Sequence, residues 1–276
     1  MHLAEWHAFG LAVSLFMRAI NIQVITDEAG IKQAWVSFAK NRLHYLREAL
    51  GLAIFMVSAC AFGALLEARH SWLHLAVHSD QVRLILMGVA MGATALFVFY
   101  CPLTAPSGSH INPAVTLTFM RLGKMSPWDT LFYIVFQFGG GVLAVYGMAA
   151  LIGSPLTEKP VHYLTTVPGR QGLWVALATE FTAGFIVMSA VLFSSESPRW
   201  AKYTRVFSAC LVCLLVITAG PLSGFGMNPA RTFASALPSG EWTGWWMYML
   251  IPVLSMLSAA EFFLYMKRRS PYHEPS

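Results

Sequence analysis

Six stretches of about twenty apolar residues divide this chain, and each is long enough to cross a lipid bilayer as a helix. A hydrocarbon core of about 30 Å needs roughly twenty residues at the rise of an α-helix. Because lipid offers no hydrogen-bond partners, the backbone of an apolar segment must satisfy its own donors and acceptors, which favours helices throughout. We expect spans near residues 45–66, 82–102, 129–152, 173–193, 203–219 and 243–266.

The composition agrees with a lipid environment. The chain is 57% hydrophobic and 11% charged, whereas soluble domains carry about 25% charged residues. All four cysteines lie in or beside apolar runs, so no disulfide framework is visible. Cys210 and Cys213 form a C-x-x-C pair inside an apolar segment, without the polar surroundings that create a reactive thiolate. We expect no metal and no cofactor.

The basic residues are distributed unevenly between the two sides of the membrane. If the N-terminus is inside, thirteen of the 18 Lys and Arg residues fall in cytoplasmic segments, from Arg18 to Arg269. The positive-inside rule therefore places both termini in the cytoplasm. The net charge of +5 is then a topology signal, and we expect no nucleic-acid partner.

Two shorter segments follow the second and fifth spans, and both open with Asn-Pro-Ala. They run from Pro113 to about Leu122 and from Pro229 to about Leu237, within "SGSHINPAVT" and "GFGMNPARTF". A ten-residue helix rises only about 15 Å, half of the hydrocarbon thickness. Three spans and one half-span therefore occur twice, and the second copy enters from the opposite side. Such inverted repeats build a site at the midplane from discontinuous helices.

The Asn-Pro-Ala tripeptide (Asn112, Pro113, Ala114 and Asn228, Pro229, Ala230) has a clear physical meaning at a helix start. Asn is a favoured N-cap, and Pro at the first helical position loses no hydrogen bond. Two helix N-termini near the bilayer centre bring unsatisfied N–H groups and about half a positive charge each. If each Asn oxygen caps its own helix, each side-chain NH2 is left to donate into a lumen. Such a site orients a water oxygen and repels cations.

With these two motifs, the chain resembles the major intrinsic protein family of aquaporins and glycerol facilitators, in a bacterial-type form. The resemblance covers about residues 47–266 and implies an all-α membrane protein of six spans and two half-helices around an hourglass pore, commonly a homotetramer. It implies that Glu48 and Glu180 hold the half-helix backbone and that His110 supports the inner loop. It also makes Arg231, directly after the second motif, the arginine of an outer constriction.

The remaining filter positions follow from counting along the chain. Phe225 lies three residues before Asn228, Val216 faces inward from the fifth span, and the second span contributes Met91 or Gly92. Water-selective members of the family usually carry His where Val216 stands, whereas Phe225 resembles the glycerol facilitators. Thr232 and Ala236 depart from the glycerol pattern, so this filter is mixed.

We divide the chain into an interfacial or cytoplasmic extension, 1–44, and a channel domain, 45–276. The channel domain holds repeat one (about 45–152), repeat two (about 173–266) and a cytoplasmic tail (267–276). Residues 3–20 are apolar but interrupted by charges, which predicts an interfacial helix. A histidine every fourth residue at His70, His74 and His78 could bind Zn²⁺ or Cu²⁺, but a polar loop helix is the favoured interpretation.

The sequence therefore predicts a passive channel in a multi-pass membrane protein, placed in a bacterial inner membrane. Its partners are water, small neutral solutes and the lipid bilayer. A channel mainly for glycerol or another neutral solute is the alternative. A secondary transporter would need ion ligands at the midplane, where the spans offer only Glu48 and Glu180 as carboxylates. An enzyme lacks a nucleophile–base pair, and the chain is expected not to be one.

Overall fold

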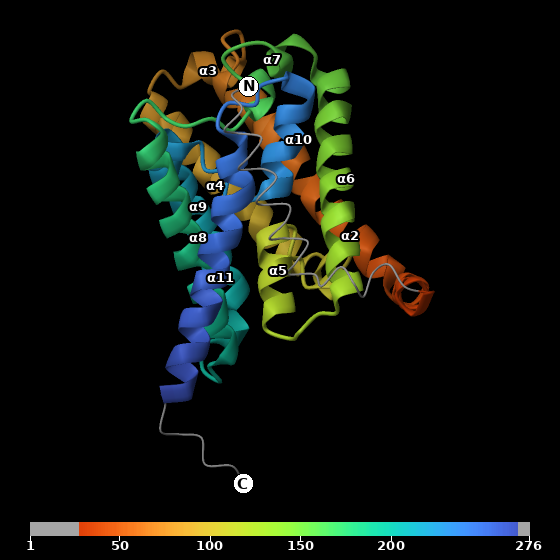
Figure 1. The fold of residues 1–276 in the computed structure, drawn as a ribbon. Helices are drawn as coiled ribbons and strands as arrows, with labels where there is room; N and C mark the ends of the chain where they lie inside the picture. The colour runs from red at the N-terminus through yellow and green to blue at the C-terminus, as the bar shows by residue number, and fades with distance from the viewer. Residues whose placement is uncertain (1–27, 270–276) are drawn as a thin grey trace.

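The computed structural model describes residues 28–269, which form helices and contain no strand (Figure 1). Six helices in this part of the chain are long and apolar enough to cross a membrane. They are α2 (Glu28–Glu67), α4 (Asp80–Tyr100), α6 (Pro127–Ile152), α8 (Leu173–Glu196), α9 (Thr204–Ser223) and α11 (Trp245–Arg269). The predicted all-helical membrane fold is confirmed.

Two half-helices and several short turns complete the bundle. The half-helices are α5 (Pro113–Arg121) and α10 (Pro229–Ser239), close to the predicted segments. The short elements are α3 (Trp72–Ala76), η2 (Ala105–Ser107), α7 (Ser154–Thr157), η3 (His162–Leu164) and η4 (Ala201–Tyr203). We call the end of the bundle with the turns at 122–126 and 197–203 the inner end, and the end with the loops at 68–79 and 153–172 the outer end.

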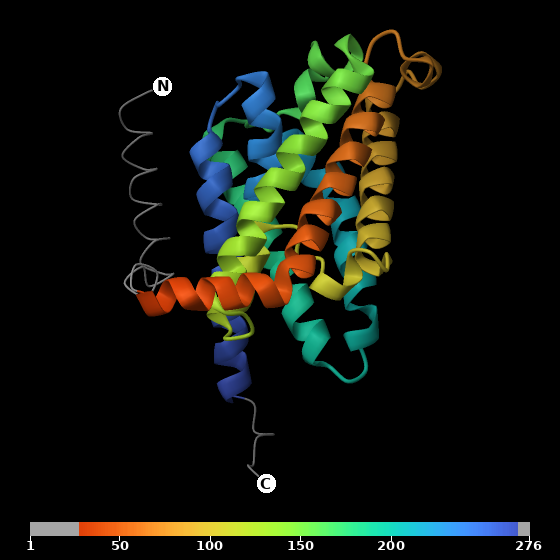
Figure 2. The same cartoon turned by 90° about the vertical axis from the view of Figure 1, so that its right-hand side faces the viewer.

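The first helix begins earlier than predicted. We expected a span from Tyr45, but α2 is already helical at Glu28 and runs for 40 residues. Its first part lies across the bundle and only the later part rises along it (Figure 2). No proline interrupts the sequence between these two parts, so the helix continues through the boundary between them. The predicted interfacial helix at residues 3–20 lies outside the described residues.

The helix contacts show how the two repeats are combined. In the first repeat α2 packs on α6, and in the second repeat α8 packs on α11 in the corresponding way. The middle spans of the two repeats, α4 and α9, pack against each other. Gly88 and Gly92 permit this approach, because a methyl group on Gly92 would lie 2.7 Å from the Cβ of Cys213. Small residues at helix contacts are what packing in a membrane requires.

Ion pairs join neighbouring elements at the two ends of the bundle. At the outer end Arg83 is buried and joins Glu67 at 3.3 Å, Asp80 at 2.5 Å and the carbonyl oxygen of Val77 at 2.9 Å. It thereby fixes the loop between α2 and α4. At the inner end Glu196 pairs with Lys267 at 2.7 Å, which ties α8 to α11.

The contact between α2 and α6 gives a test of the packing. Gly140 faces the backbone of Ala49, and a methyl group added at Gly140 would lie 2.6 Å from the Cα of Ala49. Gly140→Ala should therefore force the helices apart and cost about 1–3 kcal/mol, as overpacking does. The matched control is Gly139→Ala, because a methyl group at Gly139 meets nothing within 4 Å. We expect a lower thermal midpoint in detergent for Gly140→Ala alone; equal midpoints for both variants would contradict this packing.

Candidate pore and selectivity filter

The two half-helices start with the same cap. The Oδ1 of Asn112 accepts a hydrogen bond from the Ala114 amide at 2.9 Å. The Oδ1 of Asn228 accepts from the amides of Ala230 at 3.1 Å and Arg231 at 3.2 Å. Pro113 and Pro229 occupy the first helical position in each case. The local chemistry of Asn-Pro-Ala therefore forms two helix N-termini, as the sequence predicts.

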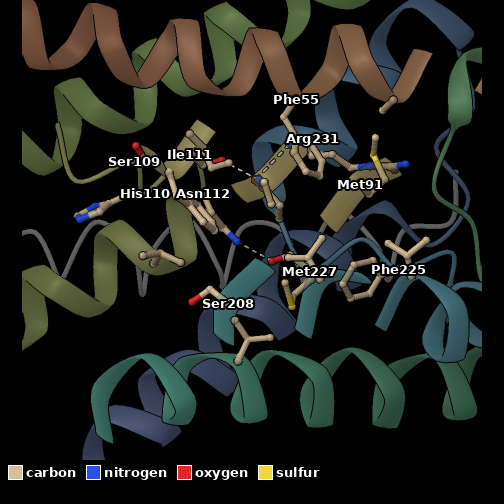
Figure 3. Close-up of a pocket in the computed structure, with 18 of the residues that line it drawn as sticks. Phe55, Met91, Ser109, His110, Ile111, Asn112, Ser208, Phe225, Met227 and Arg231 are labelled. Atoms are coloured by element: carbon tan, nitrogen blue, oxygen red, sulfur yellow. Dashed lines mark hydrogen bonds between the residues drawn. The ribbon is translucent and has the colours of Figure 1, made fainter. Parts of the chain in front are cut away.

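The two caps are also joined to each other. The Nδ2 of Asn112 donates to the carbonyl oxygen of Met227 at 2.9 Å, and the Nδ2 of Asn228 donates to that of Ile111 at 2.7 Å (Figure 3). We expected each NH2 group to donate into a lumen, whereas each one donates to a backbone carbonyl oxygen of the opposite loop. A carboxamide has two N–H donors, so one of them binds the opposite loop and the other remains for the cavity. The crossed pair fixes the distance between the two helix tips.

The loops before the half-helices, residues 105–112 and 223–228, adopt matching conformations. Each contains a left-handed glycine, Gly108 (φ 92°) or Gly224 (φ 73°). Two further residues of each loop also have positive φ: Ser109 and Ile111, Phe225 and Met227. Such conformations cost about 1–2 kcal/mol for a residue with a side chain. They persist only where the surroundings hold the backbone in place.

Glu48 of α2 supplies that support for the first loop. Its carboxylate accepts from the Ser107 hydroxyl at 2.6 Å and from the amides of His110 at 3.0 Å and Ile111 at 2.6 Å. Gln137 of α6 donates to the same carboxylate at 2.8 Å. Glu48, Ser107, Ile111 and Gln137 are buried, and an unsatisfied amide in such a place would cost about 1–3 kcal/mol.

Glu180 of α8 does the same for the second loop. Its carboxylate accepts from the Ser223 hydroxyl at 2.7 Å and from the amides of Gly226 at 2.8 Å and Met227 at 2.6 Å. A tyrosine completes each arrangement by donating to the loop backbone. Tyr133 reaches the carbonyl oxygen of Ser107 at 2.8 Å, and Tyr248 reaches that of Ser223 at 2.6 Å.

The two supports differ at two positions: His110, which sequence analysis predicted as a support of the inner loop, and Gln137, which it did not predict. His110 is matched by Gly226 in the second loop, and Gln137 has no counterpart among the hydrogen bonds around Glu180. The His110 ring stacks on Phe119 with centroids 4.7 Å apart, and its Nδ1 lies 3.2 Å from the Thr116 hydroxyl. Sequence analysis did not predict the contact between Gln137 and Glu48; the available signal was a polar amide inside an apolar span.

A cavity of about 950 Å³ runs past both helix tips. Ser109, His110 and Ser208 lie toward its inner part, while Met91, Phe225 and Arg231 lie toward the other end, with the asparagine cross-links between them (Figure 3). Among the described residues, the charged side chains in its wall are Lys202, Arg205 and Arg231, and no carboxylate is present there. The wall is otherwise mostly apolar.

The predicted filter residues meet in the outer half of this cavity. Arg231, Phe225, Val216 and Met91 all line it. Of the two alternatives in the second span, Met91 lines the cavity and Gly92 lies against α9. The Arg231 guanidinium donates to the hydroxyl of the buried Thr166, in the outer loop. Sequence analysis did not predict Thr166, or the contribution of Phe55 from α2 to the wall.

The other candidate ligands do not form a site in the described residues. No group of three or more His, Cys, Asp or Glu side chains between residues 28 and 269 could hold a metal ion. The Nδ1 of His74 lies 2.9 Å from the carbonyl oxygen of Leu66, at the end of α2. The helix that contains His74, α3, spans only Trp72–Ala76, so it cannot align the three histidines along one face.

Comparisons with known proteins agree with this arrangement. Residues 35–263 match the family described as major intrinsic protein. Aquaporin NIP2-3 of Zea mays is 35% identical over 163 residues, which cover 58% of this chain and 52% of the relative. Aquaporin NIP2-1 of Zea mays is 32% identical over 200 residues, 71% of this chain and 65% of the relative. The chain thus spans between half and two thirds of the length of these relatives.

Among solved structures, the aquaglyceroporin from Plasmodium falciparum has a similar fold. It superposes with a TM-score of 0.67 at 17% sequence identity, covering 80% of this chain and 94% of that one. At this identity the likeness concerns the arrangement of helices alone.

The buried carboxylates give a test of the site. Glu180→Gln replaces one acceptor oxygen by an NH2 group, so one loop donor faces another donor and loses its partner. We expect a destabilisation on the order of 1–3 kcal/mol. Glu261→Gln is the control, because Glu261 forms a half-exposed ion pair with Arg121. Thermal midpoints in detergent that fall equally in both variants would contradict the proposed support of the loop.

Proposed function

The chain belongs to the major intrinsic protein family, and from this premise we propose that it is a passive transmembrane pore for water and small uncharged solutes. The observation that carries the proposal is the pair of crossed asparagines. They stand beside a continuous cavity, at the point where two helix N-termini meet. The relatives named aquaporin support the same assignment.

The geometry suggests how such a pore excludes charge. The second N–H of Asn112 and of Asn228 donates to the oxygen of a passing water molecule. The Oδ1 atoms of both residues already cap the half-helices, so the two side chains act on that water as donors. The two helix tips each add about half a positive charge. Together with Arg231 and the absence of carboxylates in the described wall, they make the passage unfavourable for cations and for protons.

The filter formed by Arg231, Phe225, Val216 and Met91 determines which neutral solutes enter. Arg231 provides a fixed set of donors, held by Thr166, while the other three side chains are apolar. Such a filter offers hydrogen bonds on one side only. We propose that it conducts water and also admits small polar solutes. A channel that conducts mainly glycerol or another neutral solute is the alternative.

A secondary transporter is less well supported. Coupling to an ion gradient needs carboxylates at the conduction path, but Glu48 and Glu180 are fully buried and bind the loop backbones. Neither belongs to the cavity wall. Their negative charges therefore compensate backbone amides, and we assign them no transport or catalytic role.

The wider setting of the channel is part of the proposal. The excess of Lys and Arg on the inner side favours an inner end in the cytoplasm, with both termini there. Large apolar side chains such as Leu143 and Trp174 cover the outside of the bundle, as lipid or neighbouring subunits require. We propose a homotetramer; its location in a bacterial inner membrane stays a prediction, and the relatives compared above are from plants.

Reconstitution tests the function directly. Proteoliposomes should shrink under osmotic stress faster than bare vesicles, with a low activation energy, because water crosses a preformed pore. The flux should increase linearly with the gradient and should not depend on a proton or Na⁺ gradient. Stopped-flow light scattering measures both. Shrinkage no faster than that of bare lipid would refute the channel, and saturating, ion-dependent flux would favour the transporter.

Filter variants test the proposed selectivity. Val216→His adds bulk and a donor opposite the apolar wall, and we expect the ratio of glycerol to water permeability to fall about tenfold, equivalent to about 1.4 kcal/mol of barrier. Phe225→Ala should raise the same ratio by widening the filter. Val212→His is the matched control, because Val212 lines the same cavity one turn deeper on α9. An unchanged ratio in Val216→His would remove Val216 from the filter.

A further inference from the structure

Residues 30–44, at the beginning of α2, do not line the cavity described above. With 40 residues, α2 is about 60 Å long at the rise of an α-helix, twice the thickness of the hydrocarbon core. Residues 30–44, which we call the arm, lie across the inner end of the bundle and extend beyond it (Figures 1 and 2). A helix in this orientation cannot span the membrane, so its partner must be sought at the membrane surface.

One face of the arm is fixed to α6. The Asp129 carboxylate accepts from Ser37 at 2.6 Å, Asn41 at 2.9 Å and Tyr45 at 2.6 Å. These donors are spaced four residues apart, so they occupy a single helical face. Phe38 adds an edge-on contact with Phe132, with ring centroids 5.3 Å apart. The arm is therefore held in place by α6 and presents a defined outer surface.

That outer surface combines large apolar side chains with basic ones. Trp35, Val36 and Leu43 are 69%, 67% and 58% exposed. Lys40 and Arg42 are exposed beside them. No acidic residue occurs between Glu28 and Glu48, while this stretch contains four basic residues: Lys32, Lys40, Arg42 and Arg47. Exposed Trp with neighbouring Lys and Arg is typical of helices that lie in the headgroup region of a bilayer.

The charge pattern identifies the partner. Basic residues near a membrane surface favour anionic lipids, whose headgroups carry the opposite charge. A second copy of this chain would bring the same basic face into contact with itself, which like charges disfavour. Water alone would leave the exposed Trp35 and Val36 without an apolar partner. Among these partners, the interface of an anionic leaflet accommodates both kinds of side chain.

We propose that the arm is an interfacial lipid-binding helix, which inserts Trp35, Val36 and Leu43 among the acyl chains of the inner leaflet and binds anionic headgroups through Lys40 and Arg42. The long basic side chains reach back to the headgroups while their stems remain apolar. The fixed contact with Asp129 sets the depth of the helix relative to α6. This inference does not depend on the solute that the pore conducts.

Site-directed spin labelling of the full-length protein in vesicles tests the arm. The four native cysteines are replaced by alanine, and a nitroxide is attached at Val36→Cys. In vesicles that contain phosphatidylglycerol we expect high accessibility to oxygen and low accessibility to a water-soluble nickel chelate. In neutral phosphatidylcholine vesicles the nickel accessibility should rise, because the electrostatic attraction is lost.

A charge variant with a matched control identifies the basic side chains. Lys40→Gln with Arg42→Gln should reduce the difference between the two kinds of vesicle by at least about fivefold, the factor that one basic side chain near an anionic surface contributes. Arg268→Gln with Arg269→Gln, at the end of α11, removes the same charge elsewhere and should leave the difference unchanged.

Three outcomes would overturn the proposal. Equal and high nickel accessibility in both vesicles would place the arm in water. Low accessibility to both reagents would show that a neighbouring protein surface covers it. A lipid-dependent shift that survives in the arm variant, or is lost in the α11 variant, would assign the effect to charges elsewhere. Thermal midpoints of the labelled proteins identify any variant that has not folded. Lys40→Arg is a second test: it retains the positive charge and should keep the difference between the two kinds of vesicle.

Discussion

The structure depends on placing irregular backbone at the centre of a membrane without leaving its amides unsatisfied. Lipid cannot satisfy an exposed amide, so each loop between a span and a half-helix needs a donor or acceptor from the protein. Glu48 and Glu180 provide that acceptor in the two repeats, each binding two consecutive backbone amides and a serine hydroxyl. A carboxylate is suited to this position because it accepts from several donors at once.

From this support the pore geometry follows. Once both loops are held in their left-handed conformations, each half-helix begins near the midplane and directs its N-terminus at the other. The crossed bonds between Asn112, Asn228 and the opposite loop carbonyls then join the repeats. The carboxylates that hold the backbone, Glu48 and Glu180, are buried between the loops and the surrounding helices. The described cavity wall itself contains no carboxylate. The support is therefore compatible with the proposed exclusion of cations.

The two repeats support their loops in nearly the same way, and they differ at a few positions. The inner loop is supported by an additional amide, Gln137, and by the stacked His110. The loop before α10, residues 223–228, has Gly226 at the corresponding position, where a methyl group would overlap the Tyr248 ring. The half-helix α10 also carries Arg231, which donates to Thr166 in the loop at 153–172, more than sixty residues earlier in the chain. The two repeats thus differ in the residues that support the loops and in the arginine of the second half-helix.

The sequence alone determined the class of fold and the central motif. Apolar runs of bilayer length require helices, and Asn-Pro-Ala after such a run requires a new helix start, because both effects act over a few neighbouring residues. Tertiary structure decided what depends on distant residues. It joined each asparagine to the opposite loop and brought the Thr166 hydroxyl within hydrogen-bond distance of Arg231. The rotation of α4 about its axis also placed Met91, and not Gly92, in the cavity wall. Tertiary structure also turned the start of α2 across the bundle, because contacts with Asp129 and Phe132 are formed only when α6 packs beside it.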